Sequence, residues 1–323
     1  MIAIIGGSGF IGSSFAKLCV EGAVDDVLII DKSSGPENVA QTVVADIRDP
    51  KNIENAVPEG AIVVHLAAEH QDNVEPLSLY EDVNVQGTRN VCDVARKKNV
   101  KTIIFTSSAA VYGFSEEPIS ESSQINPFNE YGRTKAKAEE VLAAWQAEAP
   151  DERSLVIIRP TAVLGEGNRG NVYNLMRQVH SGKFLMIGSG RNRKSLAYVG
   201  NVAALLRHCL GLGAGFHLMN YADKPDLSVT EIVGLIRLAL GKSQKPALAI
   251  PYWIGVLGGL CLDLVSRISG AKFPISLVRV RKFCANTVFS TNVSEIGFSP
   301  PTSLDEAITK TVIAEFGERR EER

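Results

Sequence analysis

The first half of the chain alternates short runs of apolar, β-branched residues with longer stretches of helical periodicity. Several of the short runs are apolar throughout, as burial on both faces of a parallel sheet requires. Regular alternation of strand and helix indicates an α/β fold. The predicted strands are Ile2–Ile5, Val27–Ile30, Thr42–Val44, Ile62–Leu66, Thr102–Thr106 and Leu155–Ile158, and the predicted helices are Ile11–Glu21, Asn52–Val57, Leu79–Asn99 and Tyr131–Glu148.

After Pro160 the alternation weakens, and glycine-rich loops separate the remaining helices, which are predicted at Val172–Ser181, Thr230–Leu240 and Ser303–Phe316. We therefore expect a Rossmann-type, doubly wound parallel sheet in residues 1–165. Residues 166–323 are expected to form a smaller, partly interleaved substrate-binding region. Some of its segments are expected to return to the first domain.

Composition and charge exclude several classes of partner. The 323 residues include 34 Lys and Arg against 36 Asp and Glu, a net charge of −2. Such a balance gives no strong field for nucleic acid or an acidic membrane surface. The five cysteines form no C-x-x-C pair, which predicts buried free thiols in a reducing compartment. The amino terminus lacks the basic region of a signal peptide, so we expect a cytoplasmic location.

One uncharged segment, Ala247–Leu262, contains Pro251, Trp253 and the pair Gly258-Gly259. Its 16 residues are fewer than the about 20 that a spanning helix needs, so no membrane span is expected. We expect a buried helix or a pocket lid here. Contact with a membrane surface is the alternative.

A glycine-rich turn follows the first predicted strand. Gly6, Gly9 and Gly12 form G-x-x-G-x-x-G and open the first helix, where glycine permits a tight turn and a close approach to a pyrophosphate. Asp31 follows the second strand, where a carboxylate accepts hydrogen bonds from the adenosine ribose and repels a 2′-phosphate. The predicted cofactor is therefore NAD, although adjacent Lys32 softens the discrimination against NADP. The alternative role for Asp31 is to cap a turn.

Three further side chains suggest the chemistry. Tyr131 and Lys135 lie four apart on a predicted helix and share a face, and Ser108 follows the strand that ends at Thr106. A tyrosine pKa of about 10 is roughly three units too high for a base at neutral pH, a gap of about 4 kcal/mol. A lysine about 6 Å away supplies roughly 2.8 kcal/mol at an effective dielectric of 20, and the positive nicotinamide ring supplies much of the remainder. We expect Tyr131 to take a hydroxyl proton while Ser108 hydrogen-bonds the reacting oxygen.

At this point the sequence resembles the extended short-chain dehydrogenases/reductases, specifically the NAD-dependent epimerase/dehydratase family acting on nucleoside diphosphate sugars. The ordered similarity runs from Met1 to about Gly165 and thins to a stretch at Arg193–Ala203. The motifs that carry it are GGSGFIG, Asp46-Ile47-Arg48-Asp49, His65-Leu66-Ala67-Ala68, Asn84-Val85-Gln86-Gly87-Thr88, Ser108-Ala109-Ala110-Val111-Tyr112-Gly113 and YGRTK.

The resemblance implies a homodimer built from the helices around Thr88–Lys97 and Lys135–Trp145. It also implies dinucleotide contacts from Gly6, Ser8, Gly9, Phe10, Ile11, Asp31, Asp46, Ile47, Leu66, Ala67, Ala68, Asn84, Tyr131 and Lys135. The predicted cofactor-binding set further includes Gly12, Lys32, His70, Thr106, Pro160 and Thr161.

Some positions depart from the family's pattern. Ala162 and Asn201 stand where many relatives have asparagine and aspartate, so the sugar contact at Ala162 is not transferable. Sugar dehydratases have an acid and a base where this chain has Ala109 and Ala110. We therefore do not expect elimination of water.

The predicted activity is 4-epimerisation of a nucleotide sugar, with UDP as the expected nucleotide. The alternative is an NAD(P)-dependent reductase or dehydrogenase of a keto-sugar or a sterol-like alcohol. The apolar stretch Tyr252–Leu262 favours a hydrophobic substrate. A third class, a non-catalytic dinucleotide sensor, would have no need of Ser108, Tyr131 and Lys135. No metal is predicted, because the short cluster Glu69–Asp72 lacks a second set of His or Cys.

Overall fold

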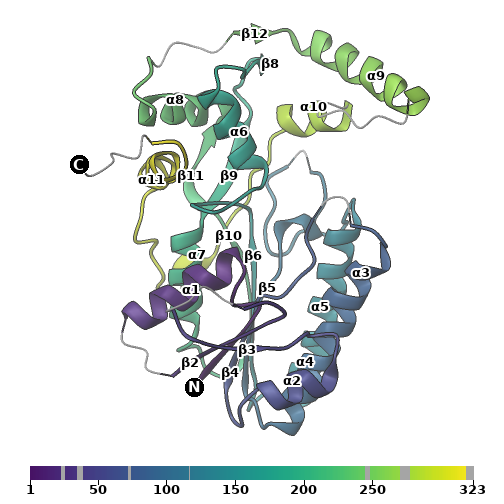
Figure 1. Ribbon diagram of the computed structural model, residues 1–323, viewed down its shortest axis with the longest axis vertical. Coiled ribbons are helices and arrows are strands. Elements are labelled where there is room, and N and C mark those ends of the chain that lie inside the picture. The colour runs from purple at the N-terminus through teal and green to yellow at the C-terminus, as the bar shows by residue number, and fades with distance from the viewer. Residues whose placement is uncertain are drawn as a thin grey trace.

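A computed structural model describes residues 1–22, 26–34, 39–71, 74–115, 117–243, 248–269 and 277–317. These residues form a lower lobe built on a large sheet and an upper lobe of short strands and helices (Figure 1). The sheet has seven parallel strands in the order β10-β6-β5-β4-β1-β2-β3. Their bounds are β1 (Ile2–Ile5), β2 (Val27–Asp31), β3 (Gln41–Val44), β4 (Ile62–His65), β5 (Thr102–Thr106), β6 (Ser154–Pro160) and β10 (Gly215–Tyr221).

Helices cover both faces of this sheet, which confirms the predicted Rossmann-type fold. On one face, α1 (Phe10–Glu21) and α7 (Val199–Cys209) bury side chains such as Phe15 against the strands. On the other face, α2 (Pro50–Ala56), α4 (Gly87–Lys97) and α5 (Glu130–Ala147) bury side chains such as Trp145. The short helix α3 (Ser78–Tyr80) and a π-helical turn, η1 (Glu81–Gln86), lead directly into α4.

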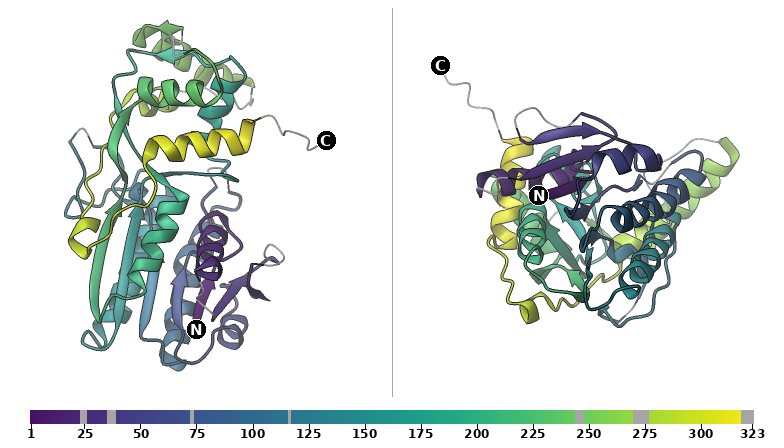
Figure 2. Two further views of the ribbon diagram at one scale, coloured as in Figure 1. Left: turned by 90° about the vertical axis from the view of Figure 1, so that its left-hand side faces the viewer. Right: turned by 90° about the horizontal axis from the view of Figure 1, so that it is seen from below.

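The upper lobe has a core of its own. It contains a three-stranded sheet of β7 (Ala162–Leu164), β9 (Arg193–Tyr198) and β11 (Asp223–Ser228), and a pair formed by β8 (Met186–Ile187) and β12 (Ala249–Ile250). Three helices pack there: α6 (Asn171–His180), α8 (Val229–Ala239) and α11 (Leu304–Phe316). The side view shows this lobe above the ends of the large sheet (Figure 2).

Two helices at the top of the molecule depart from the sequence-based expectation. They are α9 (Tyr252–Ser269) and α10 (Leu277–Cys284). The expectation of a buried helix is wrong, because Trp253 is 63% exposed and Leu257 52% exposed. Within the described residues, no helix is both long and apolar enough to cross a membrane. Ala247, the first residue of the uncharged segment, lies outside them.

All five cysteines lie in the described part of the chain and are free, but only Cys19, Cys92 and Cys209 are buried as expected, whereas Cys261 is exposed and Cys284 is half-buried. Burial raises the pKa of the Cys92 and Cys209 thiols to about 12. These thiols therefore behave as small apolar side chains of the core.

The predicted homodimer stays a prediction. The outward-facing residues of α4, one of the helices expected to form it, are charged and include Arg89, Asp93 and Arg96.

Candidate active site

The turn between β1 and α1 is built by glycines that allow close backbone approach. Gly6 has a φ of +83°, and a Cβ at this position would lie 2.5 Å from the backbone nitrogen of Ala67. A Cβ at Gly12 would lie 2.4 Å from the carbonyl oxygen of Gly6. Gly9 is the residue before α1, with Phe10 and Ile11 in the first turn. The free N–H groups at this end of a 12-residue helix make a cradle suited to a pyrophosphate.

Asp31 lies beside this turn at the end of β2. Its carboxylate accepts hydrogen bonds from the backbone nitrogen of Ser8 (3.0 Å) and from the backbone nitrogen and hydroxyl of Ser33 (both 3.1 Å). Asp31 therefore caps a turn and also stands next to the glycine cradle, so both roles considered from the sequence are compatible with the geometry. Lys32 is exposed, and its charge helps Arg48 to lower the pKa of Asp46.

The loop after β3 contains Asp46 and Ile47. The Arg48 guanidinium forms a hydrogen-bonded ion pair with Asp46, which holds the pKa of that carboxyl below its usual range. Ile47 is buried, and its carbonyl accepts a hydrogen bond of 2.9 Å from Asn90 on α4. The loop is thus fixed against α4, with the Asp46 carboxylate only partly buried.

The segment after β4 is held by Asn84. Leu66, Ala67 and Ala68 follow the strand, and His70 is exposed. The Asn84 amide accepts from the backbone nitrogen of Glu69 (2.8 Å) and donates to the Glu69 carbonyl (3.0 Å) and the Thr134 hydroxyl (2.9 Å). The buried side chain of Asn84 therefore makes three hydrogen bonds, two of which hold the segment after β4 in place.

Buried hydroxyls without partners mark the ends of β5 and β6. Among the described residues, the Oγ1 atoms of Thr106 and Thr161 have no hydrogen-bond partner, and neither does Nδ1 of His65 at the end of β4. Pro160 is also buried at the end of β6. Open α/β sheets bind ligands at these strand ends, where unsatisfied buried polar groups call for a partner. Together with the glycine cradle, the residues present fit a bound dinucleotide.

Ser108 and Tyr131 are brought together by Gly132. A Cβ at Gly132 would lie 2.4 Å from the carbonyl oxygen of Ala110, so only glycine lets α5 begin against this turn. Asn129 caps α5 by accepting a hydrogen bond of 2.9 Å from the Gly132 nitrogen. Ser108 precedes the one-turn helix η2 (Ala109–Val111) and hydrogen-bonds the Tyr131 side chain.

Lys135 lies one turn further along α5 and is buried. Its Nζ donates a hydrogen bond of 2.6 Å to the Thr106 carbonyl and lies 3.9 Å from the centre of the Phe105 ring. Burial lowers the pKa of Lys135 to about 7, and the negative charge of Glu139 opposes this shift. Burial and the positive charge of Lys135 lower the pKa of His65 to about 3, so this histidine is neutral.

The pKa of Tyr131 differs from the sequence-based expectation. Burial raises it above 10, and the hydrogen bond with Ser108 opposes only part of the shift. We expected Lys135 to lower this pKa, but its ammonium is directed to the Thr106 carbonyl. The chain alone therefore holds the tyrosine protonated, and the remaining stabilisation of a phenolate must come from a positively charged group bound beside it.

A buried network behind Lys135 was not found from the sequence. Arg159 on β6 donates hydrogen bonds to Glu139 (Nε to Oε1, 2.9 Å) and to the Tyr112 hydroxyl (2.6 Å). Tyr112 in turn donates to Asn220 on β10 (2.7 Å), and Ser107 hydrogen-bonds Glu139. The spacing of four between Lys135 and Glu139 is the one signal that could have indicated part of it.

Asn201, a departure from the family's pattern, has a structural explanation. Its Nδ2 donates to the buried Asp223 carboxylate (2.9 Å) and to the Thr302 carbonyl (2.7 Å). Asp223 also accepts from the Tyr198 nitrogen (2.6 Å) and the Tyr221 hydroxyl (2.5 Å). An aspartate at 201 would place a second carboxylate against Asp223, so this chain requires a donor there.

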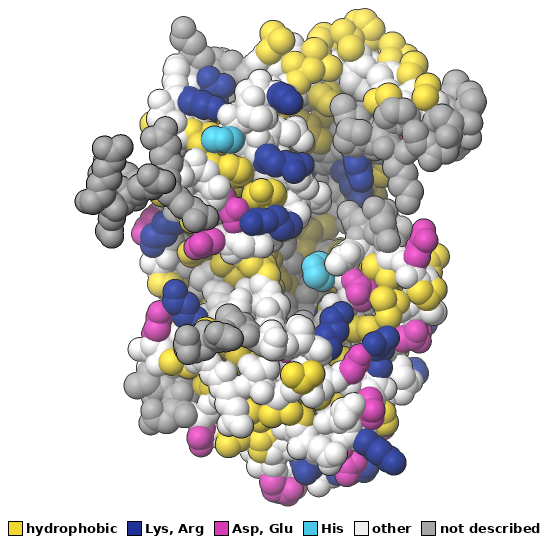
Figure 3. All heavy atoms as spheres, viewed as in Figure 1, with side chains coloured by type: hydrophobic (Ala, Val, Ile, Leu, Met, Phe, Trp, Pro, Cys, Tyr) yellow, Lys and Arg dark blue, Asp and Glu magenta, His cyan; other side chains and the backbone are white. Residues whose placement is uncertain are grey.

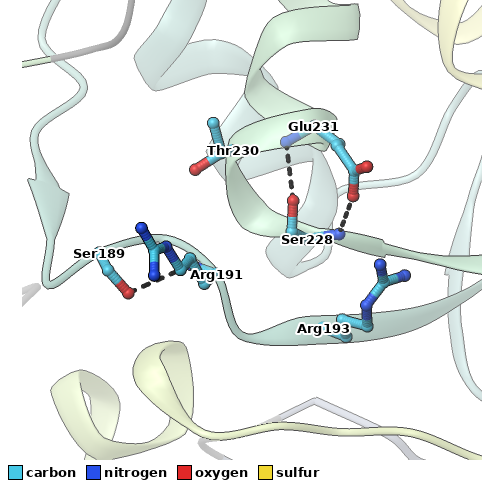
Figure 4. Close-up of a pocket in the computed structure, with 6 residues that line it drawn as sticks. All are labelled: Ser189, Arg191, Arg193, Ser228, Thr230 and Glu231. Atoms are coloured by element: carbon cyan, nitrogen blue, oxygen red, sulfur yellow. Dashed lines mark hydrogen bonds between the residues drawn. The ribbon is translucent and has the colours of Figure 1, made fainter.

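Two hollows of the upper lobe carry cationic side chains. The first is lined by Ser189, Arg191, Arg193, Ser228, Thr230 and Glu231 (Figure 4). Figure 4 shows Ser228 and Glu231 joined by two hydrogen bonds at the start of α8. The second hollow shares Ser189 and is lined by Tyr252 and Arg281 among others. Neither is lined by Ser108, Tyr131 or Lys135, so both are separate from the reacting groups.

The described residues contain no group of three His, Cys, Asp or Glu placed to hold a metal ion. His70 is exposed, and Glu69 uses one carboxylate oxygen to accept from the backbone nitrogens of His70 (3.1 Å) and Gln71 (3.3 Å). Asp72, the last member of the short cluster considered from the sequence, lies outside the described residues.

Comparison with known proteins extends the similarity along the whole chain. The profile of the NAD dependent epimerase/dehydratase family matches residues 2–219. The N-acetyl-alpha-D-glucosaminyl-diphospho-ditrans,octacis-undecaprenol 4-epimerase of Escherichia coli O157:H7 is 45% identical over 317 residues, 98% of this chain and 95% of the relative. UDP-glucose 4-epimerase of Vibrio cholerae is 30% identical over 338 residues, 97% and 94% of the two chains. The solved structure of MoeE5 with UDP-glucuronic acid and NAD has a TM-score of 0.75 at 21% identity, covering 96% of this chain and 97% of MoeE5.

The family profile spans the glycine cradle, Ser108, Tyr131 and Lys135, and the two curated relatives extend the similarity through the upper lobe. The fold, the geometry of the glycine cradle and the sequence similarity agree. The chain belongs to the NAD-dependent epimerase/dehydratase family, and its cofactor is NAD.

Proposed function

We propose that this protein inverts C4 of a hexose or N-acetylhexosamine that is linked through a diphosphate. The observation that carries the proposal is the pairing of Ser108 and Tyr131 at the end of β5, with Lys135 one turn behind and the glycine cradle alongside. The relatives from E. coli and V. cholerae are named as 4-epimerases of a lipid-linked diphosphosugar and of UDP-glucose. A diphosphate-linked sugar is the chemistry these two substrates share, and UDP remains the carrier expected from the sequence.

The residues divide the work between proton and hydride. NAD, when bound, supplies the acceptor for the hydride of C4 and the source of its return. Tyr131, ionised when the positive charge of NAD lies beside it, takes the proton of the C4 hydroxyl as the 4-keto sugar forms and gives it back as the epimer forms. Ser108 holds the reacting oxygen against the tyrosine. Lys135 places a positive charge beneath the site, and its bond to the Thr106 carbonyl fixes where that charge lies.

The absence of acid–base residues next to Ser108 supports epimerisation over dehydration. Ala109 and Ala110 fill the positions where elimination would need an acid and a base. A 4-keto sugar held here has no nearby side chain on η2 to remove a proton from C5. The 4-keto sugar is therefore reduced back to a sugar with a C4 hydroxyl instead of losing water.

The upper lobe supplies cations for the diphosphate in this proposal. Arg191 and Arg193 line one hollow and Arg281 lines its neighbour. Arginine side chains bind phosphate oxygens through two parallel N–H donors. For the location and assembly of the protein we retain a cytoplasmic homodimer, and the five free thiols support a reducing compartment.

The proposal is tested with NAD-loaded protein and no added cofactor. We expect UDP-N-acetylglucosamine or polyprenyl diphospho-N-acetylglucosamine to be converted to its C4 epimer, with deuterium at C4 retained in the product. Tyr131→Phe should keep NAD bound and lose at least about a hundredfold in turnover, the usual scale of acid–base catalysis. Stoichiometric consumption of NADH with a keto-sugar or a sterol ketone, without epimer from either substrate, would instead identify the reductase considered from the sequence.

A further inference from the structure

The outer face of α9 is apolar, and no described residue covers it. Trp253 and Leu257 are more than half exposed, and neighbouring apolar side chains share this face. Gly255 and Gly259 are buried on the opposite side, and a Cβ at Gly255 would lie 2.4 Å from the side chain of Ile187. Large apolar residues of α9 therefore face solvent, whereas Gly255 and Gly259 face the protein, which is the reverse of an ordinary surface helix. The exposed apolar patch comprises Tyr252, Trp253, Ile254, Leu257 and Leu260.

The sequence around this patch is strongly basic. Residues 242–284 contain seven Lys or Arg and one acid, Asp263, a net charge of +6, whereas the whole chain has −2. The rest of the chain therefore sums to −8. Asp263 accepts a hydrogen bond of 3.1 Å from the backbone nitrogen of Leu277 at the start of α10. Figure 3 shows apolar side chains gathered at the top of the molecule over α9, with Lys and Arg below them.

The helix α10 connects this patch to the loop that precedes Tyr131. On α10, Lys282 lies 3.9 Å from the centre of the Phe128 ring, which stacks on Phe114 at 4.6 Å. Phe128 is three residues before Tyr131. A Cβ at Gly255 would also lie 3.5 Å from Val280 of α10, so α9 and α10 pack together. The patch and the loop that precedes Tyr131 therefore share α10 as a common support.

We propose that α9 binds in the interface of an anionic lipid bilayer, so that the enzyme takes its diphosphate-linked sugar from a lipid carrier at the membrane surface. An amphipathic helix with an apolar face, basic neighbours and an exposed tryptophan binds membranes in this way. The choice of a lipid carrier rests on the proposed function, whereas membrane binding rests on α9 and its charges alone. A second copy of the chain is a poorer occupant, because a symmetric contact through α9 would bring two segments of charge +6 together.

The test is flotation of the NAD-loaded, full-length protein with vesicles of phosphatidylglycerol and phosphatidylethanolamine. We expect the wild type to float, less so with pure phosphatidylcholine vesicles or at high salt. The double variant Trp253→Ser, Leu257→Ser should partition at least tenfold more weakly. The matched control Phe216→Ser, Ile313→Ser removes apolar residues of similar exposure from β10 and α11, at 49% and 56%, and should float like the wild type.

Parallel measurements separate this proposal from the proposed function. The patch variant should keep wild-type epimerisation of a water-soluble UDP-N-acetylhexosamine, or of a short-chain lipid diphosphosugar in detergent, and lose activity on the long-chain substrate in vesicles. Wild-type protein that does not float overturns membrane binding, whatever its activity. A lower mass of the patch variant by light scattering also overturns it, because α9 would then be a contact between copies. Flotation without any epimerisation would leave membrane binding intact and refute the proposed function.

Discussion

Gly6 offers a sharp test of the cofactor cradle, because a second glycine of the chain provides a matched control. Gly6 and Gly60 both have left-handed backbone, with φ of +83° and +65°. A Cβ at Gly6 would lie 2.5 Å from the Ala67 nitrogen, whereas a Cβ at Gly60 would meet nothing within 4 Å. Alanine at either position costs about 1–2 kcal/mol for the left-handed conformation. Only Gly6→Ala adds a collision, which costs about 1–3 kcal/mol in a packed region.

We therefore expect Gly6→Ala to lower the free energy of unfolding by about 2–5 kcal/mol, and Gly60→Ala by about 1–2 kcal/mol. Reaching an ordinary carbon contact of about 3.5 Å also requires the Ala67 backbone to move by roughly 1 Å. That movement opens the wall of the cradle, so NAD affinity should fall at least tenfold in Gly6→Ala and stay unchanged in Gly60→Ala. Urea denaturation and a fluorescence titration with NAD measure the two effects.

Equal destabilisation of the two variants would refute this reasoning. It would mean that the segment after β4 yields to a methyl group without cost, and that the close approach at Gly6 is not required for folding. Unchanged NAD affinity in Gly6→Ala, with the expected loss of stability, would show that the cradle tolerates the displacement.

Three other variants probe the electrostatics of the site. Glu139→Gln removes the charge that supports the Lys135 ammonium. The Lys135 pKa, already lowered to about 7, should fall further. Because the proposed role of Lys135 uses its positive charge, activity is lost as the pH rises through this pKa. The alkaline limb of the kcat/KM profile should therefore move to lower pH by about one to two units. Asn201→Asp places a carboxylate against Asp223, whose pKa burial already raises, and should cost about 3 kcal/mol of stability at pH 8 and less at pH 5 by urea denaturation. Asp31→Ala should weaken NAD binding about tenfold and relax discrimination against NADP in titrations, and a wild type that prefers NADP would contradict the role of this carboxylate.

The parallel sheet of the first half was predictable because its signal is local. Each of the six predicted strands is present, since continuous apolar runs between helical stretches have few other ways to be buried. The predicted helices begin and end within a few residues of those observed. The glycine turn and the spacing of Tyr131 and Lys135 are likewise short-range patterns.

The parts that depend on distant partners were not predictable in this way. The seventh strand, β10, contains His217 and Asn220 among its apolar residues, which weakens the pattern of a buried strand. The network of Glu139, Arg159 and Tyr112 joins three segments that only the folded sheet brings together. No sequence spacing expresses such contacts.

The character of α9 was misjudged for a related reason. An uncharged stretch is equally consistent with a buried helix and with an exposed one. Gly255 of α9 lies against Ile187 and Val280, and the close packing that a glycine permits becomes visible only once its neighbours are known. Hydropathy alone therefore did not distinguish a buried α9 from an exposed one.

The place of β10 in the large sheet has a consequence for biosynthesis. All seven of its residues pair with β6, ending with Tyr221 beside Pro160. Until the ribosome has released Tyr221, β6 presents an unpaired edge of seven buried residues, the kind of edge that pairs with other chains and aggregates. A fragment that ends at residue 165 would keep this edge permanently. Successful expression of the cofactor-binding half therefore requires the strand that the second half contributes.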